Sequence, residues 1–169
     1  MLHNLLEWSK LEYIGLKPFK ERVDLQLFMR EVIEQVQYQA SFKSVDLKWE
    51  LEPGVTVFTD RHMLRTSVYN LMSNAIKFSN KDDAVLVIGK STPYGTSIEV
   101  IDQGVGMDAA TVQRLEAPKV NFSTFGTENE KGSGVGLVLV KEMLQLMGAR
   151  LEIESKVGEG STFRIIMPE

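Results

Sequence analysis

Cysteine is missing from the 169-residue chain, and histidine occurs only twice. Without cysteine there is no disulfide framework and no thiolate metal site, which is compatible with a cytoplasmic location. No apolar run approaches the roughly 18 residues of a membrane-spanning helix, and no charged-then-apolar signal segment opens the sequence. We therefore expect a cytoplasmic domain, within a parent protein that is either soluble or anchored in a membrane.

Positive charge is also scarce, because 23 Asp and Glu residues outnumber 19 Lys and Arg residues. The net charge of −4 and the pI of about 5.3 do not favour nucleic acid or an anionic membrane as a main partner. Hydrophobic residues make up 43% of the chain and charged residues 25%, as in soluble globular proteins. The length fits one ordinary domain, which we expect to be monomeric in isolation.

Helical and strand-like patterns alternate along the chain. Long helices are predicted after Asp24 and after Asp60, which are placed to cap them, and over residues 135–147, where Gly148 is placed to end the helix. A shorter helix is predicted near residues 109–115. Strands are predicted within residues 17–24, 45–51, 55–59, 84–91, 96–102, 150–155 and 161–167. Together these patterns predict an α+β fold, a two-layer sandwich of three main helices on a mixed sheet of about five or six strands.

The second predicted helix carries polar residues in register. Asn70, Asn74 and Lys77 fall within roughly 60° of one another around the helix, apart from the apolar stripe that contains Leu71 and Ala75. Amide oxygens suit Mg²⁺ that also binds phosphate and water, and a lysine neutralises phosphate charge. The pattern is typical of a surface that borders a cleft, although a solvated helix face is the alternative.

A lone carboxylate precedes two glycines in the D-x-G-x-G stretch formed by Asp102, Gly104 and Gly106. A carboxylate accepts hydrogen bonds but donates none, so it suits an exocyclic amine such as that of adenine. The glycines permit close approach of the backbone to a ligand. An ordinary turn at the end of a strand is the alternative interpretation.

A glycine-rich stretch, with Gly132, Gly134 and Gly136, leads into the helix over residues 135–147. Free backbone N–H groups at a helix start favour phosphate. The stretch is not a Walker A loop, because no Gly-Lys-Ser/Thr follows at the required spacing. It is not the Rossmann fingerprint either, because the third glycine of that motif would fall at Leu137.

Four stretches follow one another in the chain: N-x-x-x-N-A-x-K-F from Asn70, D-x-G-x-G from Asp102, G-x-G-x-G-L from Gly132 and G-x-G-S-x-F from Gly158. In this order they resemble the catalytic, ATP-binding domain of bacterial sensor histidine kinases, in the superfamily that includes gyrase, Hsp90 and MutL ATPases. The resemblance implies a Bergerat-type ATP-binding fold for residues 17–169. It also implies that residues 1–16 are a remnant of the dimerisation and phosphoacceptor helix hairpin, with a helix packed on its own domain as the alternative.

On the phosphate side of the site, the resemblance implies that Asn74 ligates Mg²⁺ and that Lys77 contacts phosphate. Asn70 would support the metal or the phosphate side. The glycine-rich stretch would wrap the triphosphate through Gly132, Gly134 and Gly136. Leu137 would pack behind these glycines.

On the adenine side, the resemblance implies that Asp102 holds the adenine amino group, with Gly104 and Gly106 shaping the pocket. Ser161 stands where the family often has a hydroxyl near the adenine. Residues 107–131 would form a flexible lid over ATP. Two residues of this lid match the phenylalanine box of the family only loosely, Phe122 and Phe125.

The resemblance implies that the chain binds Mg-ATP and donates the γ-phosphoryl group to a histidine on the dimerisation domain of the same kinase. A response regulator or receiver domain would act downstream in two-component signalling. Neither His3 nor His62 is followed by the acidic residue of the family's acceptor motif, so we expect the acceptor elsewhere. Two alternatives remain: a hydrolytic ATPase of the gyrase or Hsp90 type, whose glutamate base is replaced here by Asn70, and a degenerate nucleotide-binding scaffold.

Overall fold

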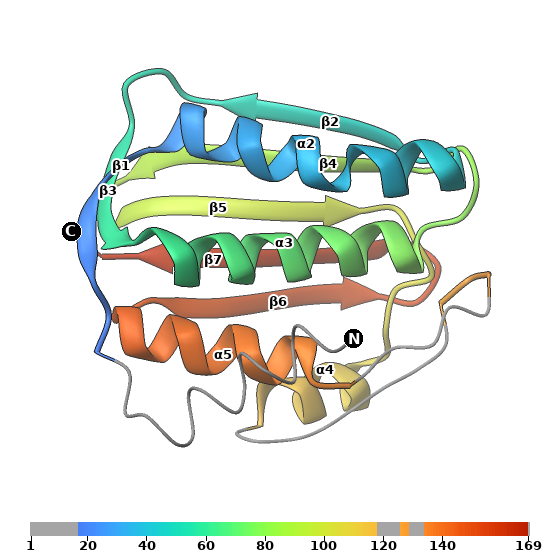
Figure 1. The fold of residues 1–169 in the computed structure, drawn as a ribbon. Helices are drawn as coiled ribbons and strands as arrows, with labels where there is room; N and C mark the ends of the chain where they lie inside the picture. Colours follow the sequence, from blue (N-terminus) through green and yellow to red (C-terminus); the bar gives the residue numbers. More distant parts are fainter. Residues whose placement is uncertain (1–16, 118–125, 129–133, 169) are drawn as a thin grey trace.

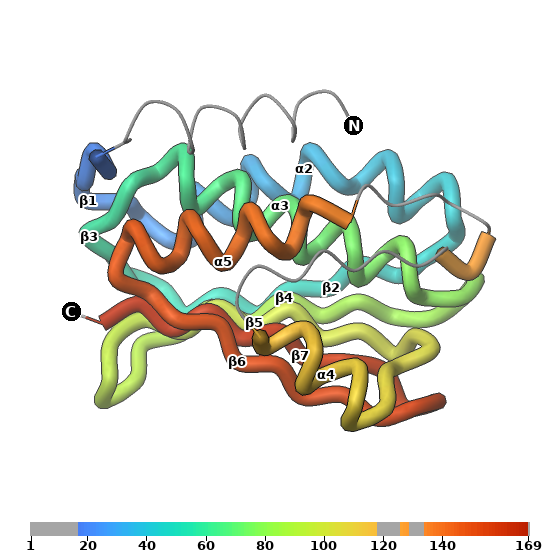
Figure 2. Tube along the Cα trace, turned by 90° about the horizontal axis from the view of Figure 1, so that it is seen from below, coloured from blue at the N-terminus to red at the C-terminus, as the bar shows by residue number. Residues whose placement is uncertain are grey.

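The computed structural model describes residues 17–117, 126–128 and 134–168. Its elements are β1 (Lys20–Asp24), α2 (Leu25–Lys43), β2 (Asp46–Leu51), β3 (Thr56–Asp60), α3 (Arg61–Phe78), β4 (Ala84–Thr92), β5 (Gly95–Asp102), α4 (Ala109–Glu116), α5 (Gly136–Met147), β6 (Arg150–Lys156) and β7 (Gly160–Met167). They form two layers, with α2, α3 and α5 side by side on one face of a five-stranded sheet (Figures 1 and 2). The expected hairpin remnant, residues 1–16, lies outside the described residues.

The main sheet is mixed, as predicted. Its strand order is β2-β4-β5-β7-β6, with β2 parallel to β4 and the other neighbours antiparallel. The strands on either side of Pro53 and Gly54 belong to different sheets, because β3 pairs with β1 in a separate two-stranded sheet. The α+β two-layer fold is confirmed, and α4 adds a short fourth helix to the three main ones within the described residues.

The core lies between the two layers because the inward positions of the central strands are apolar. Val85 and Val87 of β4 and Ile98 and Val100 of β5 are fully buried under the apolar faces of the helices. Helix α2 packs so closely on β4 that a Cβ atom added to Gly89 would lie 2.9 Å from the side chain of the first helical residue. Nowhere in the described ranges is a helix both long and apolar enough to cross a membrane.

Aspartates begin the two long helices, as predicted. Asp24 is exposed and accepts a hydrogen bond from Leu27 N at 2.9 Å. Asp60 is buried and uses both carboxylate oxygens, because Oδ1 accepts from Met63 N at 2.9 Å and Oδ2 accepts from Phe19 N at 2.8 Å. Asp60 therefore fixes both the start of α3 and the chain that enters β1.

The two caps predict unequal losses of stability. Asp24→Ala should lower the free energy of unfolding by about 1 kcal/mol, the usual effect of losing an N-cap. Asp60→Ala should lower it by about 2–3 kcal/mol, because the backbone N–H of Phe19 also loses its acceptor and the aspartate that is removed is itself buried. Urea unfolding followed by circular dichroism measures both values. Equal losses would contradict the role given to Asp60 in holding the chain before β1.

Candidate functional site

The C-terminal half of α3 carries the predicted polar face. Asn70 is buried, with 6% of its surface exposed, and its Nδ2 donates to Thr66 O at 2.7 Å. Asn74 and Lys77 are half-buried, and Lys77 Nζ lies 4.6 Å from the centroid of the Phe78 ring. The alternative of a solvated helix face is therefore wrong for Asn70, whose amide is oriented within the fold.

The D-x-G-x-G turn packs directly against the end of α3. It follows β5, and Val105 N donates to Phe78 O at 3.2 Å. A Cβ atom on Gly104 would lie only 2.2 Å from that same carbonyl oxygen. Glycine is thus required at this position by the close contact of two backbone segments, which joins Asp102 to the helix that carries the asparagines.

The second glycine of the turn contacts the loop between β6 and β7. Gly106 has a φ of +62°, and a Cβ atom there would lie 1.9 Å from Lys156 O. Gly158 N returns a hydrogen bond to Val105 O at 2.8 Å. The stretches around Asp102 and Gly158, which are far apart in the sequence, therefore form one continuous backbone surface.

Ser161 lies next to the buried carboxylate of Asp102. Its N–H donates to Asp102 Oδ1 at 3.2 Å, and its hydroxyl lies 3.0 Å from Ser155 Oγ. Ser155 Oγ accepts from Met107 N at 2.8 Å and donates to Gly160 O at 3.0 Å. Because the hydroxyl proton of Ser155 is used in the bond to Gly160 O, Ser161 must be the donor in the contact between the two serines. The hydroxyl oxygen of Ser161 therefore remains available as an acceptor.

Ser155 was missed from the sequence. The signal that could have found it is the β6–β7 hairpin register, in which Ser155 is directly opposite Ser161.

Asp102 is the most perturbed carboxyl group of the site. Only 4% of its surface is exposed, and this burial raises its pKa to about 6, although hydrogen bonds from Gly104 N and Ser161 N oppose the shift and the charge of Asp83 adds to it. Both of these N–H groups donate to Oδ1, at 2.9 and 3.2 Å. Within the described residues Oδ2 has no hydrogen-bond partner, so it is available to an amine or amide donor.

The start of α5 lies at the same end of the molecule as the end of α3 and the end of β5 (Figure 1). Aspartates cap α2, α3 and α4, but no side chain caps α5. Gly134 has a φ of +70° just before this helix, and Leu137 packs against the core. An uncapped helix start presents backbone N–H groups to an anion.

Some predicted residues cannot be placed. Gly132, Phe122 and Phe125 lie outside the described residues, as does much of the predicted lid. The part of the lid that is described includes α4, whose Leu115 is buried against the core, and residues 126–128. Thr127 of this second piece donates from N to Lys77 O at 3.3 Å and from Oγ1 to Ser79 O at 2.7 Å, a connection that no local sequence signal indicates.

The described residues contain no group of three or more His, Asp or Glu side chains that could hold a metal ion by themselves. An amide oxygen such as that of Asn74 is a hard ligand suited to Mg²⁺. A metal at this end of α3 would therefore depend on further oxygens from a phosphate group and from water.

Comparison with known proteins gives one family match. A sequence model of the family described as histidine kinase-, DNA gyrase B-, and HSP90-like ATPase matches residues 59–169. The autoinducer 2 sensor kinase/phosphatase LuxQ of Vibrio harveyi is 29% identical over 175 residues, which cover 99% of this chain and 20% of LuxQ. The histidine protein kinase DivJ of Caulobacter vibrioides is 33% identical over 177 residues, which cover 99% of this chain and 28% of DivJ. The chain thus spans less than a third of these relatives.

Among solved structures, full-length ShkA in complex with AMPPNP superposes with a TM-score of 0.81 at 24% identity. The match covers 98% of this chain and 34% of ShkA. At this level of identity the likeness shows the fold alone, and it agrees with the two-layer arrangement in Figure 2.

The burial of Asp102 predicts a pH-dependent effect on stability. Because its pKa is raised in the folded state, the folded chain binds more protons than the unfolded chain between about pH 4 and pH 6, and stability falls as pH rises through this window. Asp102→Asn stays neutral and keeps an acceptor oxygen. It should therefore be more stable than the wild type by on the order of 1–3 kcal/mol at pH 7.5, and by much less at pH 4.

Asp108→Asn is the matched control for this measurement. Asp108 is an exposed helix cap whose pKa is lowered by its hydrogen bonds to Thr111, so its replacement should reduce stability at pH 7.5 rather than increase it. Urea unfolding of the three proteins at both pH values gives the differences. If Asp102→Asn were no more stable than the wild type at pH 7.5, burial of the charged carboxylate would not lower the stability of the folded state.

Proposed function

Because the chain belongs to the family of histidine kinase-, DNA gyrase B- and HSP90-like ATPases, we propose that it binds Mg-ATP and donates the γ-phosphoryl group to a histidine on a separate domain of a sensor histidine kinase. The observation that carries the proposal is the buried carboxylate of Asp102, which has an oxygen without a partner in the described part of the chain. Its relatives LuxQ and DivJ are named as kinases, and ShkA was solved with AMPPNP, an analogue of ATP.

The adenine ring would bind against the turn that follows β5. Oδ2 of Asp102 would accept a hydrogen bond from the exocyclic amine, and the backbone of Gly104 and Gly106 would lie close to the ring. Ser161, with its hydroxyl oxygen left as an acceptor, would contact the same edge of the base directly or through water. A base with a carbonyl in place of the amine would meet two acceptors, so this site favours adenine over guanine.

The phosphates would bind between the end of α3 and the start of α5. Asn74 would ligate Mg²⁺, Lys77 would contact phosphate, and Asn70 would support this side of the site from its buried position. The backbone N–H groups in the first turn of α5, from Gly136 onward, would face the phosphate oxygens. Bound Mg²⁺ would neutralise charge on the phosphates during transfer.

Hydrolysis is the second candidate activity, and the site argues against it. Activation of water requires a group that takes a proton, and the amide of Asn70, buried and hydrogen-bonded to Thr66 O, cannot do so. Of the described residues proposed for the phosphate side, Asn70, Asn74 and Lys77 would bind and orient the phosphates rather than take a proton from water. We therefore propose transfer to an acceptor supplied by another domain, rather than to water.

The histidines of this chain do not replace that acceptor. His62 is exposed in the first turn of α3, whereas Lys77 is in the last turn, about 22 Å away along the helix axis. We propose that the acceptor lies on a dimerisation domain to which residues 1–16 connect residues 17–169, and that a response regulator or receiver domain takes the phosphoryl group afterwards. Because ATP is abundant in the cytosol, a domain that binds it as proposed would act on the cytoplasmic side.

Adenine recognition is tested by calorimetry with ATP. Asp102→Asn should weaken binding by about 1–3 kcal/mol, because it replaces a charged acceptor by a neutral amide whose NH₂ group faces the adenine amine. The control Asp83→Asn removes a nearby negative charge outside the site and should change the affinity little. Equal affinities of Asp102→Asn and the wild type would remove Asp102 from the adenine site, and no ATP binding by the wild type would contradict the proposed function itself.

Transfer is tested with γ-labelled ATP and Mg²⁺. The chain alone should bind ATP without becoming labelled, and addition of a protein that carries the acceptor helices of a matching kinase should yield acid-labile, base-stable label on that partner. Asn74→Ala should reduce this labelling more than Asn74→Asp, which keeps an oxygen ligand. Stoichiometric label on the isolated chain would show that its own residues include the acceptor.

A further inference from the structure

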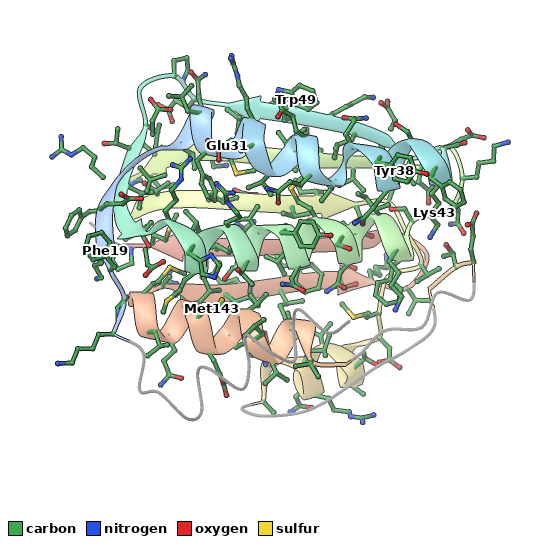
Figure 3. The ribbon with its side chains drawn as sticks, viewed as in Figure 1. Phe19, Glu31, Tyr38, Lys43, Trp49 and Met143 are labelled. Carbon is green, nitrogen blue, oxygen red and sulfur yellow. The ribbon has the colours of Figure 1, made fainter. Side chains whose placement is uncertain are left out.

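Lys43 is a buried lysine that the proposed mechanism does not use. It is the last residue of α2, and only 5% of its surface is exposed. Its Nζ donates a hydrogen bond of 2.5 Å to Lys77 O, in the last turn of α3. Figure 3 shows Lys43 between the ends of these two helices.

The receiving carbonyl explains why a buried ammonium group is tolerated. An ammonium group taken out of water is strongly unfavourable unless it is paired. The carbonyl groups of the last helical turn lack partners within the helix and carry its partial negative charge. Lys43 therefore gains an acceptor with negative potential, and α3 gains a donor at its C-terminal end.

Further donors from outside the helix reach Lys77 O and the carbonyls that follow it. Thr127 donates to Lys77 O and Ser79 O, and Val105 N donates to Phe78 O at 3.2 Å. Lys43 makes the shortest of these contacts and is the only one of these donors that comes from another helix. Helix α2, the turn after Asp102 and residues 126–128 are all joined at this turn of α3.

We propose that Lys43 is a positioning residue for the phosphate side of the nucleotide site. By holding Lys77 O, Lys43 fixes the turn of α3 from which the Lys77 side chain reaches phosphate, and it acts without touching the nucleotide. This inference rests on the proposed function, because Lys77 is taken to contact phosphate. It assigns a role in ATP binding to a residue that lies outside the four sequence stretches.

The test compares two ligands in Lys43→Met, which keeps the length of the side chain and removes its charge. Calorimetry should show an affinity for Mg-ATP lowered by at least about fivefold, the effect of losing a hydrogen bond to a charged group. The affinity for adenosine should stay within about twofold, since adenosine lacks phosphate and binds at Asp102. Equal losses for both ligands, or no loss for ATP, would overturn the proposal.

Val36→Ala is the matched control. Val36 is fully buried on the same helix, and its truncation destabilises the core without removing a donor from α3. This variant should lower the melting temperature and leave the ratio of the two affinities unchanged. An ATP-specific loss in Val36→Ala as large as that in Lys43→Met would assign the effect to general destabilisation.

Hydrogen exchange without nucleotide tests the anchoring separately from the proposed function. The amides of Phe78, Ser79 and Thr127 should exchange faster in Lys43→Met than in the wild type, and unchanged rates would overturn the proposal. If the wild type failed to bind ATP, the proposed function would be wrong, even if the exchange rates confirmed that Lys43 holds this turn of α3. If Lys43→Met does not fold, Thr127→Val is the second variant, because it removes the hydrogen bond to Ser79 O. We expect it to show the same ATP-specific loss of affinity. An unchanged affinity for ATP in Thr127→Val would contradict the anchoring of this turn.

Discussion

The carbonyl groups in the last turn of α3 need hydrogen-bond donors, and the arrangement of the site depends on where those donors come from. A helix cannot satisfy them itself. Lys43 donates to Lys77 O, and Val105 donates to Phe78 O. Thr127 donates to the carbonyls on either side of Phe78, those of residues 77 and 79. Segments from three parts of the chain are thereby held at the end of the helix that carries Asn74. Any shift of that helix end would displace the turn after Asp102 and the polar face of α3 together.

The same close packing produces the buried carboxylate. Gly104 lets the turn after β5 lie against the carbonyl of Phe78. This packing keeps water away from Asp102. Burial raises the pKa of Asp102 to about 6, so the charged form is held at the expense of folding stability at neutral pH. Oδ1 of this carboxylate accepts hydrogen bonds from two backbone donors, whereas Oδ2 accepts none within the described residues. Oδ2 can therefore accept a hydrogen bond from a ligand. Perturbed groups of this kind concentrate at functional sites.

Much of the fold could be predicted from the sequence because its signals are local. Asp24 and Asp60 cap the helices they precede, strands form in the segments where they were predicted, and Gly148 ends α5 in the left-handed conformation. The pairing of β3 with β1 instead of β2 could not be predicted, since strand partners are chosen by the whole core. Local signals also marked Asp102 and the glycines after it, whose packing against the end of α3 the structure then revealed.

The parts of the site that could not be predicted are contacts that depend on strand register and on helix packing. Ser155 supports Ser161 only because the β6–β7 register places them opposite each other, and Lys43 looks like an ordinary helix-terminal lysine until α2 and α3 are packed together. Ser155 could be found only from the register of the hairpin, and Lys43 only from the packing of the two helices, so no motif spacing identifies them. The residues that a sequence motif reveals are those that would face the ligand. The residues that hold them in place are set by tertiary structure, and a family motif alone therefore understates how much of the chain determines the arrangement of the candidate site.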